Sequence, residues 1–325
     1  MRVGVVGAGV AGLGAARYLA RADQEVVVFE KSGGFGGRCA TRRAGGFVFD
    51  HGATSVAPRG REIEDLILRQ LPTDDLVKIE KPIYTHHIGR ITTSSSPSSR
   101  IDRYCYGKGM NVLGKLLADG LDVRLSTQVE TIEKASGKFE IMGEPFDALV
   151  LTPPIPQTEL LLATLGETRN FANSRYRPVL SVMLGYDAPL DTPYHALVDP
   201  DQSEPLTWLS VESVKCPGRA PDGKTAIVAQ LSPSYSRWNY ESTEEAIVAN
   251  TVIDVARLLG PAFSSPVVTD LKRWRYSQPE TTVSFESINR KGSKVLVASD
   301  GLIGGRIENA YDAGLQAAQW LMETA

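Results

Sequence analysis

Apolar runs with the length of buried strands alternate with helical patterns at the start of the chain. Arg2–Val6 is a short β-rich run, a helical pattern follows it through Arg21, and Glu25–Phe29 has the character of a second buried strand. Later runs at Val123–Glu130 and Asp147–Thr152 predict further strands, and two prolines end the second of them. Strand, helix and strand in this order predict a βαβ unit with parallel strands.

The remaining patterns extend this α/β interpretation to the rest of the chain. Lys294–Ala298 predicts a strand, and it leads into a helix from about Arg306 to Met322 whose small residues allow close packing. In the middle of the chain, Val179–Tyr186 and Ala226–Leu231 predict strands, and Thr243–Leu259 predicts a helix.

These elements predict a discontinuous Rossmann-like domain with an inserted α+β domain that binds the substrate. The Rossmann-like domain is expected to comprise residues 1–57, 105–156 and 271–325. The inserted domain is expected to comprise residues 58–104 and 157–270. Within it, the serine-rich stretch Thr92–Ser99 predicts a surface loop, and a lid over the active site is the alternative.

The composition is that of an ordinary globular protein, and it excludes several functions. The 325 residues are 42% hydrophobic and 22% charged, with 35 Lys plus Arg, 38 Asp plus Glu and a net charge of −3. General nucleic-acid binding and polybasic membrane binding need a clear positive excess, so neither is expected. No apolar run approaches the ~18 residues that span a bilayer, so no transmembrane segment is expected.

The cysteines and the N-terminus together predict a cytoplasmic protein. Cys39, Cys105 and Cys216 are few, odd in number and widely spaced, which argues against a disulfide scaffold and favours a reducing compartment. The glycine-rich N-terminus is typical of folded protein rather than of a secretory signal. The sequence carries no prediction of the oligomeric state.

The glycines after the first strand have the spacing of a dinucleotide-binding turn. Gly7 allows the tight turn, Gly9 lets the backbone approach a pyrophosphate, and Gly12 lets the helix pack closely on the strand. The backbone N–H groups that open the helix, at Val10 and Ala11, then face the phosphates. A glycine-rich turn without a nucleotide is the alternative, and the βαβ context disfavours it.

An acid and a second glycine-rich loop extend this predicted nucleotide site. Glu30 ends the second strand, 23 residues after Gly7, and is placed to accept hydrogen bonds from a ribose; its charge disfavours a 2′-phosphate. The loop Lys31–Arg38 contains four glycines, among them Gly37, which let the main chain wrap round a long ligand. The planar guanidinium of Arg38 suits a diphosphate, whereas a flexible surface loop with one basic residue is the alternative.

These segments resemble the glutathione-reductase-like FAD proteins of the flavin amine oxidase superfamily, and within it the renalase-like flavoproteins. The resemblance covers about half of the chain, in segments Val3–Arg38, Asp50–Ala53, Tyr106–Leu117 with the strand to Glu130, Leu149–Leu162 and Arg273–Ala318. The motifs of the superfamily are Gly33–Arg38 and the block from Asp300 to Gly314. Those that point to the renalase-like branch are Tyr106–Met110 and Arg273–Pro279.

The resemblance implies FAD as the cofactor and assigns its contacts. The ADP half would be held by Gly7, Gly9, Gly12, Glu30, Lys31 and Arg38. Val129 would contact the adenine and Asp300 the pyrophosphate and ribityl region, while Arg306 and Ile307 would open a helix at the flavin N1–C2=O edge, where N–H groups stabilise negative charge. The remaining predicted cofactor contacts are Val10, Ala11, Gly37, His51, Gly52, Ala53 and Thr152.

Three local features modify what the resemblance implies. Thr54-Ser55-Val56 stands where the renalase-like pattern has Gln-Tyr-Phe, and Ser299 replaces the usual glycine before Asp300. Both changes lie close to where flavin and substrate are expected to meet, so they bear on the identity of the substrate and not on FAD binding. No cysteine lies near Asp300 or the C-terminal helix, where covalent amine oxidases of this superfamily attach their flavin. Non-covalent FAD is therefore expected.

The catalytic candidates lie beside the predicted flavin. His51 is an acid/base or a hydrogen-bond donor to the ring, and a histidine that only packs the loop is an equally weighted alternative. Trp274 and Tyr276 would form one wall of the substrate pocket, with Arg275 on the opposite face of the strand to attract an anionic substrate; core packing also explains the two aromatic rings. His86-His87 lacks acidic or cysteine partners at ligand spacing, so no metal site is expected.

Three functions follow from these features. The first is a renalase-like FAD oxidase, in which a small hydride donor such as a misreduced NAD(P)H isomer reduces the flavin and O2 reoxidises it to give H2O2. The second is an amine oxidase or desaturase acting on an apolar small molecule, although an aromatic content of 7% argues against an amine-binding aromatic cage. The third is a non-catalytic flavin-binding sensor.

Overall fold

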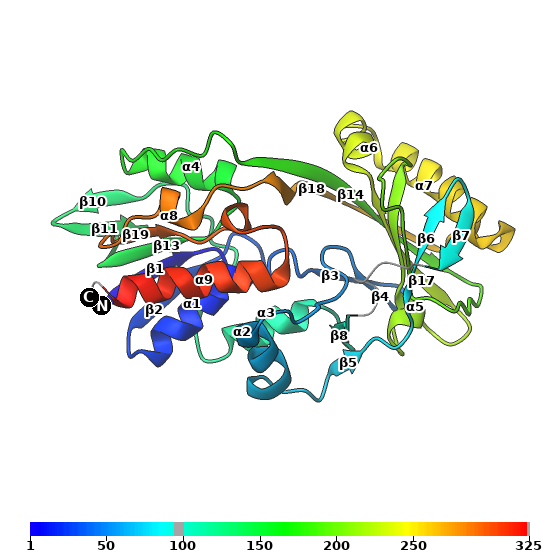
Figure 1. The fold of residues 1–325 in the computed structure, drawn as a ribbon, viewed down its shortest axis with the longest axis horizontal. Helices are drawn as coiled ribbons and strands as arrows, with labels where there is room; N and C mark the ends of the chain where they lie inside the picture. The colour runs from blue at the N-terminus through cyan, green and yellow to red at the C-terminus, as the bar shows by residue number, and fades with distance from the viewer. Residues whose placement is uncertain (94–100, 324–325) are drawn as a thin grey trace.

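The structure, a computed structural model, describes residues 1–93 and 101–323 (Figure 1). It has one part built on a five-stranded sheet and another built on a seven-stranded sheet. They are called the five-stranded part and the seven-stranded part below. The expected loop or lid at Thr92–Ser99 lies outside the described residues from position 94 onward.

The five-stranded sheet is parallel and has the order β19-β13-β1-β2-β9. Its strands are β1 (Arg2–Val6), β2 (Glu25–Phe29), β9 (Asp122–Arg124), β13 (Ala148–Leu151) and β19 (Val295–Val297). Strands β1 and β2, with helix α1 (Val10–Arg21) between them, confirm the predicted βαβ unit. All residues of β1, β2 and β13 except Arg2 and Glu25 are buried, which explains why these three strands form continuous apolar runs in the sequence.

Small residues bring two helices together on one face of this sheet. Helix α9 (Ile307–Met322) confirms the predicted C-terminal helix and packs along α1 (Figure 1). A Cβ atom on Gly314 would lie 2.0 Å from the carbonyl oxygen of Ala11, so the two backbones are in direct contact there. Helix α3 (Asn111–Ala118) lies against α1 as well.

Shorter elements complete the five-stranded part. The small antiparallel sheet consists of β10 (Glu133–Ala135), β11 (Lys138–Ile141) and β12 (Glu144–Phe146). The short helices and turns are α2 (Arg61–Asp65), η1 (Leu66–Gln70), α4 (Ile155–Thr164), α8 (Phe285–Ile288) and η4 (Asp300–Leu302). Two ribbons, β3 (Thr41–Ala44) with β4 (Phe47–Asp50) and β5 (Leu76–Lys78) with β8 (Tyr104–Tyr106), lead toward the other part.

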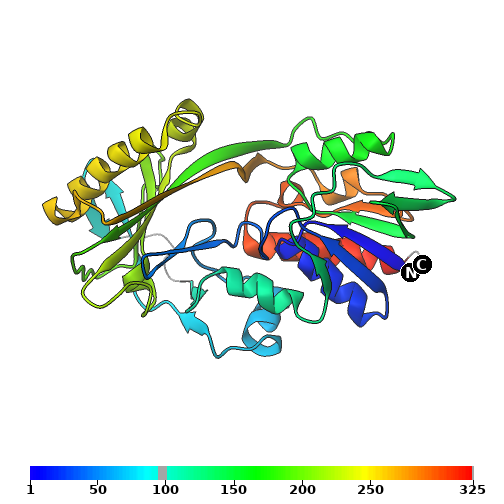
Figure 2. The same ribbon diagram turned by 180° about the vertical axis from the view of Figure 1, so that it is seen from behind.

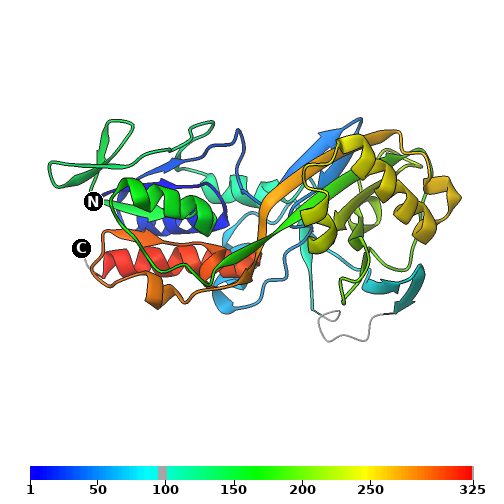
Figure 3. The same ribbon diagram turned by 90° about the horizontal axis from the view of Figure 1, so that it is seen from above.

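The seven-stranded sheet has the order β18-β14-β17-β16-β15-β6-β7 and is antiparallel except between β15 and β6. Its strands are β6 (Ile83–His87), β7 (Arg90–Thr93), β14 (Arg175–Tyr186), β15 (Ala196–Val198), β16 (Leu206–Val211), β17 (Thr225–Leu231) and β18 (Val268–Thr281). The helices of this part are α5 (Glu212–Lys215), α6 (Pro233–Trp238), α7 (Glu244–Leu259) and the turn η3 (Pro261–Phe263). Figure 3 shows α7 lying over this sheet, and its buried Ile247 and Val255 join the sheet's apolar core.

Two long strands connect the parts. Strands β14 and β18 pair over most of their length and extend from the seven-stranded part toward the five-stranded part (Figure 2).

The structure confirms three elements predicted for the middle of the chain: the strands at Val179–Tyr186 and Ala226–Leu231 and the helix at Thr243–Leu259. The hydroxyl of Thr243 caps that helix by accepting a hydrogen bond from the N–H of Ala246.

One predicted strand is shorter than expected. Val123–Glu130 was predicted to be extended throughout, but β9 ends at Arg124. The chain turns there, with Ser126 at φ +54°, and the N–H groups of Ser126 and Thr127 donate to the carbonyl oxygens of Ser32 and Glu30. These hydrogen bonds hold the turn against the loop after β2, so no sheet partner is available to continue the strand.

The division into two domains stays a prediction, and the packing favours moving some of its boundaries. Buried Ile63 and Ile67 of the segment 61–70 and buried Leu161 of α4 belong to the same apolar core as β1. All of β18 belongs to the seven-stranded sheet, including positions 271–281. In the part of the chain that the structure describes, none of the helices combines the length and apolar character needed to cross a membrane.

Candidate active site

A cleft of about 1130 Å³ is lined by both parts, from the glycine turn after β1 to strand β18. This volume exceeds the ~300–1,000 Å³ typical of small-ligand pockets, so the cleft has room for a long cofactor with a substrate beside it. The predicted cofactor residues that line it are Gly7, Gly9, Val10, Ala11, Glu30, Lys31, Gly37, Arg38, His51, Gly52, Ala53, Val129, Thr152, Asp300, Arg306 and Ile307. The predicted catalytic residues Trp274, Arg275 and Tyr276 line it too.

The glycines of the turn have different surroundings. Gly7 has φ +102°, a conformation that favours glycine, and a Cβ atom on Gly9 would meet nothing within 4 Å. Gly12 does not line the cleft; its Cβ atom would lie 1.9 Å from the carbonyl oxygen of Gly7. Gly9 therefore leaves the cleft open beside the backbone, and Gly12 lets the helix approach the turn.

Glu30 joins the two loops at this end of the cleft. Its Oε2 accepts a hydrogen bond from the backbone N–H of Ala8 at 2.8 Å. Its Oε1 accepts from the N–H and the hydroxyl of Ser32, at 2.8 and 2.7 Å. Glu30, which is predicted to bind the ribose, thus also holds the glycine turn and the loop after β2 together.

Arg38 and Asp300 form an ion pair across the cleft wall. Nη1 of Arg38 lies 2.6 Å from Oδ2 of Asp300, and the hydroxyl of Tyr176 on β14 donates to Oδ1 at 2.7 Å. The same Nη1 donates to the carbonyl oxygen of Ser277 on β18 at 2.9 Å. The pair predicted to face the pyrophosphate is therefore anchored to both long strands.

His51 follows β4 and lies against Trp274. The two rings stack at 5.4 Å with an interplanar angle of 24°, and the indole N–H donates to the carbonyl oxygen of His51 at 2.9 Å. Nδ1 of His51 is buried and has no hydrogen-bond partner among the described residues. The pKa of His51 is lowered to about 4, first by burial and then by the positive charges of Arg42 and Lys272. The ring is neutral at pH 7, so it does not act there as an imidazolium acid.

The two aromatic rings on β18 are half-buried, whereas Arg275 is exposed. The rings of Tyr276 and Tyr176 pack edge to face, with their centroids 5.9 Å apart. Arg275 pairs with Glu241 at 3.3 Å and lies over the ring of Tyr240 at 4.6 Å. Its charge is therefore committed to an outward-facing pair.

Comparison with known families identifies the chain. Residues 98–322 match the family described as flavin containing amine oxidoreductase, and residues 5–70 match the NAD(P)-binding Rossmann-like domain. The chain belongs to the flavin-containing amine oxidoreductase family. Members of this family are flavin-containing oxidoreductases, and the second match assigns a Rossmann-like nucleotide-binding fold to residues 5–70.

Curated relatives of this family member are similar over part of their length. A 4,4'-diapophytoene desaturase (4,4'-diaponeurosporene-forming) of Staphylococcus aureus is 38% identical over 103 residues, which are 28% of this chain and 19% of the desaturase. Protoporphyrinogen oxidase 2 of Arabidopsis thaliana is 32% identical over 145 residues, which are 45% of this chain and 24% of that protein. The chain thus spans about a fifth to a quarter of these relatives.

Solved structures share the whole fold at low sequence identity. A protein from Exiguobacterium sp. 255-15, provisionally assigned as a protoporphyrinogen oxidase, has a TM-score of 0.80 at 15% identity and covers 100% of this chain and 99% of its own. Cyclohexylamine oxidase from Brevibacterium oxydans IH-35A has a TM-score of 0.72 at 14% identity, with coverage of 99% and 98%. These similarities show the fold.

The cleft of this flavin oxidoreductase fits FAD on three observations. The space beside Gly9 is open, as a pyrophosphate needs. Helix α9 begins at the cleft, where Arg306 and Ile307 line it. His51, whose buried Nδ1 lacks a partner among the described residues, lines the cleft. The contact of each individual residue with FAD stays a prediction.

The loop from His51 to Thr54 is held by side chains of the seven-stranded part. Besides the bond from Trp274 to His51, Nε2 of Gln230 donates to the carbonyl oxygen of Gly52 at 2.7 Å. Nζ of Lys215 donates to the carbonyl oxygen of Thr54 at 2.9 Å. These three contacts therefore set the position of a loop that lines the cleft.

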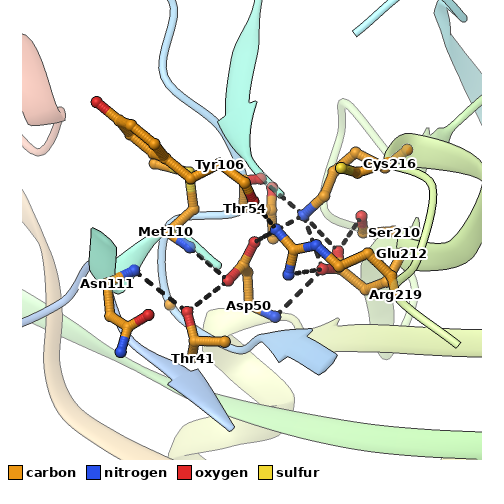
Figure 4. Close-up of polar contacts among 12 residues, drawn as sticks. Thr41, Asp50, Thr54, Tyr106, Met110, Asn111, Ser210, Glu212, Cys216 and Arg219 are labelled. Carbon is orange, nitrogen blue, oxygen red and sulfur yellow. Dashed lines mark hydrogen bonds and ion pairs between the residues drawn. The ribbon is translucent and has the colours of Figure 1, made fainter. Parts of the chain in front are cut away.

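Lys215 belongs to a fully buried charge cluster of Asp50, Glu212, Lys215 and Arg219 (Figure 4). Lys215 Nζ lies 3.0 Å from Asp50 Oδ2 and 2.7 Å from Glu212 Oε1, and Arg219 Nη2 lies 2.8 Å from Asp50 Oδ2. Burial raises the pKa of Asp50, but Lys215 and Arg219 outweigh burial and lower the pKa to about 2. The positive charges of Lys215 and Arg219 thus balance the negative charges of Glu212 and of Asp50, the residue before His51.

Sequence reasoning missed this cluster and Lys272. Glu212 and Lys215 stand three positions apart and read as an ordinary pair on a solvated helix. Nothing in the local sequence distinguishes them from surface residues, because their burial depends on Asp50, which is 165 positions from Lys215. In the described residues, no group of three or more His, Cys, Asp or Glu is arranged to hold a metal ion.

Proposed function

We propose that this flavin oxidoreductase is an oxidase of the renalase-like type that acts on a small hydride donor, with dihydronicotinamides such as misreduced NAD(P)H isomers as the first candidates and O2 as the acceptor. The observation that carries the proposal is the continuity of the cleft from the glycine turn to Trp274. One end suits the nucleotide half of FAD, and the other leaves room for a second molecule. FAD supplies the hydride-accepting ring when it is bound.

In this proposal the protein's own residues bind FAD and orient the hydride donor. The turn at Gly7 and Gly9, with Glu30, would bind the ADP half, and the start of α9 would face the flavin N1–C2=O edge. Trp274, stacked on His51, would form the wall against which a planar donor lies. A donor that carries a transferable hydride needs no protein acid or base in that step, so the proposal assigns no proton transfer to His51.

The second candidate is oxidation or desaturation of an apolar small molecule, or oxidation of an amine. The curated relatives favour it, since one is a desaturase and the other a protoporphyrinogen oxidase. The sensor alternative loses support because the family consists of oxidoreductases. A cytoplasmic location is part of the proposal and is supported by three free cysteines.

An anaerobic absorbance titration of the FAD-loaded protein tests the proposed function. We expect 2- and 6-dihydro-NAD to bleach the flavin band near ~450 nm rapidly, and air to restore it with formation of H2O2. The same titration with a primary amine and with protoporphyrinogen IX tests the second candidate. Bleaching by either of these, and not by any dihydronicotinamide, would replace the first proposal with the second.

A further inference from the structure

Positive charge gathers at the substrate end of the cleft. The charged residues from β3 and β18 that line it are all basic: Arg42, Lys272, Arg273 and Arg275. The acidic lining residues Glu30, Glu130 and Asp300 come from the loops and strand ends of the five-stranded part. A ligand beside Trp274 therefore lies near basic side chains of β3 and β18.

These four cations differ in what compensates them. Arg42 pairs with Asp270 at 3.1 Å and Arg275 with Glu241 at 3.3 Å. Arg273 donates to backbone carbonyl oxygens of Tyr240 and Ser242. Within the described residues, Lys272 has no carboxylate partner; its Nζ lies 5.0 Å from the centre of the Trp274 ring.

Strand register puts Lys272 on the face of the sheet that carries the substrate wall. It lies opposite Ser181 on β14, which in turn lies opposite Gln230 on β17. Gln230 donates to the loop that holds His51, so this face is directed at the cofactor side. Arg273 lies opposite Leu180, whose side chain is in the core beneath α7, and therefore points to the other face.

A second polar group without a partner lies on the same face. The hydroxyl of Ser181 is fully buried and makes no hydrogen bond with the described residues. Lys272 and Arg42 also act together at the cofactor side, because both lower the pKa of His51. A positive charge without a counter-ion, next to an aromatic wall, is an arrangement that attracts an anion and repels a protonated amine.

We propose that Lys272, supported by Arg42, binds a carboxylate or phosphate group of the substrate while the oxidisable part of that substrate lies against Trp274. The inference rests on the proposed function, since it names the substrate class of the same site. Arg275, the residue that the sequence predicts for anion attraction, is already paired with Glu241. The site is thus assigned to a neighbour three positions earlier on β18.

Ligands of one shape and different charge test the proposal on the FAD-loaded protein. Benzoate, phenyl phosphate, benzamide and benzylamine are titrated, and binding is followed both by the flavin spectrum and by calorimetry. We expect benzoate or phenyl phosphate to bind at least about tenfold more tightly than benzamide, and benzylamine to bind most weakly. The order of the two anions distinguishes a carboxylate site from a phosphate site, and added salt is expected to weaken both.

Two variants locate the effect. Lys272→Gln is expected to remove the preference for anions over benzamide while FAD stays bound. Lys224→Gln, which makes the same charge change before β17 and outside the cleft, is expected to keep it. Failure of both anions to bind more tightly than benzamide, or an unchanged preference in Lys272→Gln, would overturn the proposal.

Failure of the proposed function gives a different result. If no dihydronicotinamide bleaches the flavin but the anions still bind through Lys272, the reaction is wrong and the substrate class stands. If dihydronicotinamides bleach the flavin but the charge series shows no preference, the reaction stands and the anion site is wrong.

Discussion

At the scale of single residues, the glycines of the first turn separate folding from ligand binding. Gly9 and Gly12 belong to one motif, yet only Gly9 borders the cleft. The space beside Gly9 is empty of protein atoms, whereas the space beside Gly12 is filled by the carbonyl oxygen of Gly7. A substitution at Gly9 should therefore impair FAD binding, whereas a substitution at Gly12 should impair folding.

We expect Gly9→Ala to fold normally and to bind FAD at least about tenfold more weakly, because the added methyl group occupies the path of the pyrophosphate. Gly12→Ala is expected to lose about 1–3 kcal/mol of folding stability, because helix and turn must move apart. Urea unfolding and FAD titration of both variants check this. A Gly9→Ala protein with unchanged FAD affinity would show that the pyrophosphate lies elsewhere.

Buried histidines make stability depend on pH. His51 and His195 are buried, and burial is the main cause that lowers the pKa of each to about 4. Between pH 6.5 and pH 4 the unfolded chain binds more protons than the folded one. The stability contributed by the neutral rings is thus complete above pH 6.5 and is lost as the pH falls through this window, by up to about 3 kcal/mol for each ring.

Urea unfolding at pH 7.5 and pH 5 measures this loss. His195→Gln is expected to lose less stability between the two pH values than the wild-type protein does, because one buried titrating ring is gone. His87→Gln serves as the control, since that side chain is 60% exposed. Equal losses in wild type and His195→Gln would contradict the assignment.

At the scale of elements, the buried cluster fixes the loop after β4 to the seven-stranded part. Asp50 ends β4, and Glu212 and Lys215 form α5 at the end of β16. Burial lowers the pKa of Lys215, but Asp50 and Glu212 outweigh burial and raise it above its usual value. The charged form of the lysine therefore persists inside the protein and holds the carbonyl oxygen of Thr54.

Lys215→Met is expected to destabilise the protein by about 3–5 kcal/mol, because it leaves buried carboxylates with one cation fewer. Lys291→Met removes an exposed pair with Glu323 and should change stability by less than about 0.5 kcal/mol. Chemical denaturation of both variants is the measurement. A stability loss of Lys215→Met as small as that of the control would mean that the cluster is not maintained in solution.

At the scale of the whole molecule, each of the two parts has a large apolar core, and both parts line the cleft. One core contains β1 and α9, and the other contains β14 and α7. Contacts such as Tyr176 with Asp300, Arg38 with the carbonyl oxygen of Ser277, and Gln230 with Gly52 cross between the two parts. A cofactor in the cleft would add contacts to both sides, so its binding should stabilise the molecule as a unit.

We expect the thermal midpoint Tm of the protein to rise with FAD concentration, by the equivalent of about 2.7 kcal/mol when free FAD is a hundred times its Kd. The proposed non-covalent attachment predicts that acid precipitation releases the flavin into the supernatant. Differential scanning calorimetry across FAD concentrations checks the first expectation. Flavin that stays with the precipitate would contradict the second.

The nucleotide end was the more predictable half of the site. The motif from Gly7 to Gly12 and the strand ending at Glu30 are short-range patterns, and Gly7, Gly9 and Glu30 line the cleft, whereas Gly12 packs the helix against the turn. Arg275 shows the limit of such reasoning. Alternation along the strand predicted that Arg275 and Trp274 lie on opposite faces, but only the tertiary structure shows that Arg275 forms an ion pair with Glu241.

By itself, the sequence determined the βαβ unit, the C-terminal helix and the family of this protein. Local spacing is sufficient for the unit and the helix, because hydrophobic periodicity and glycine geometry act within a few residues, whereas the family was implied by the resemblance of its motifs. Only the tertiary structure decided that Lys215 is buried against Asp50 and that Lys272 lacks a carboxylate partner in the described part of the chain. The state of a charge depends on which distant residues surround it, and packing sets that neighbourhood.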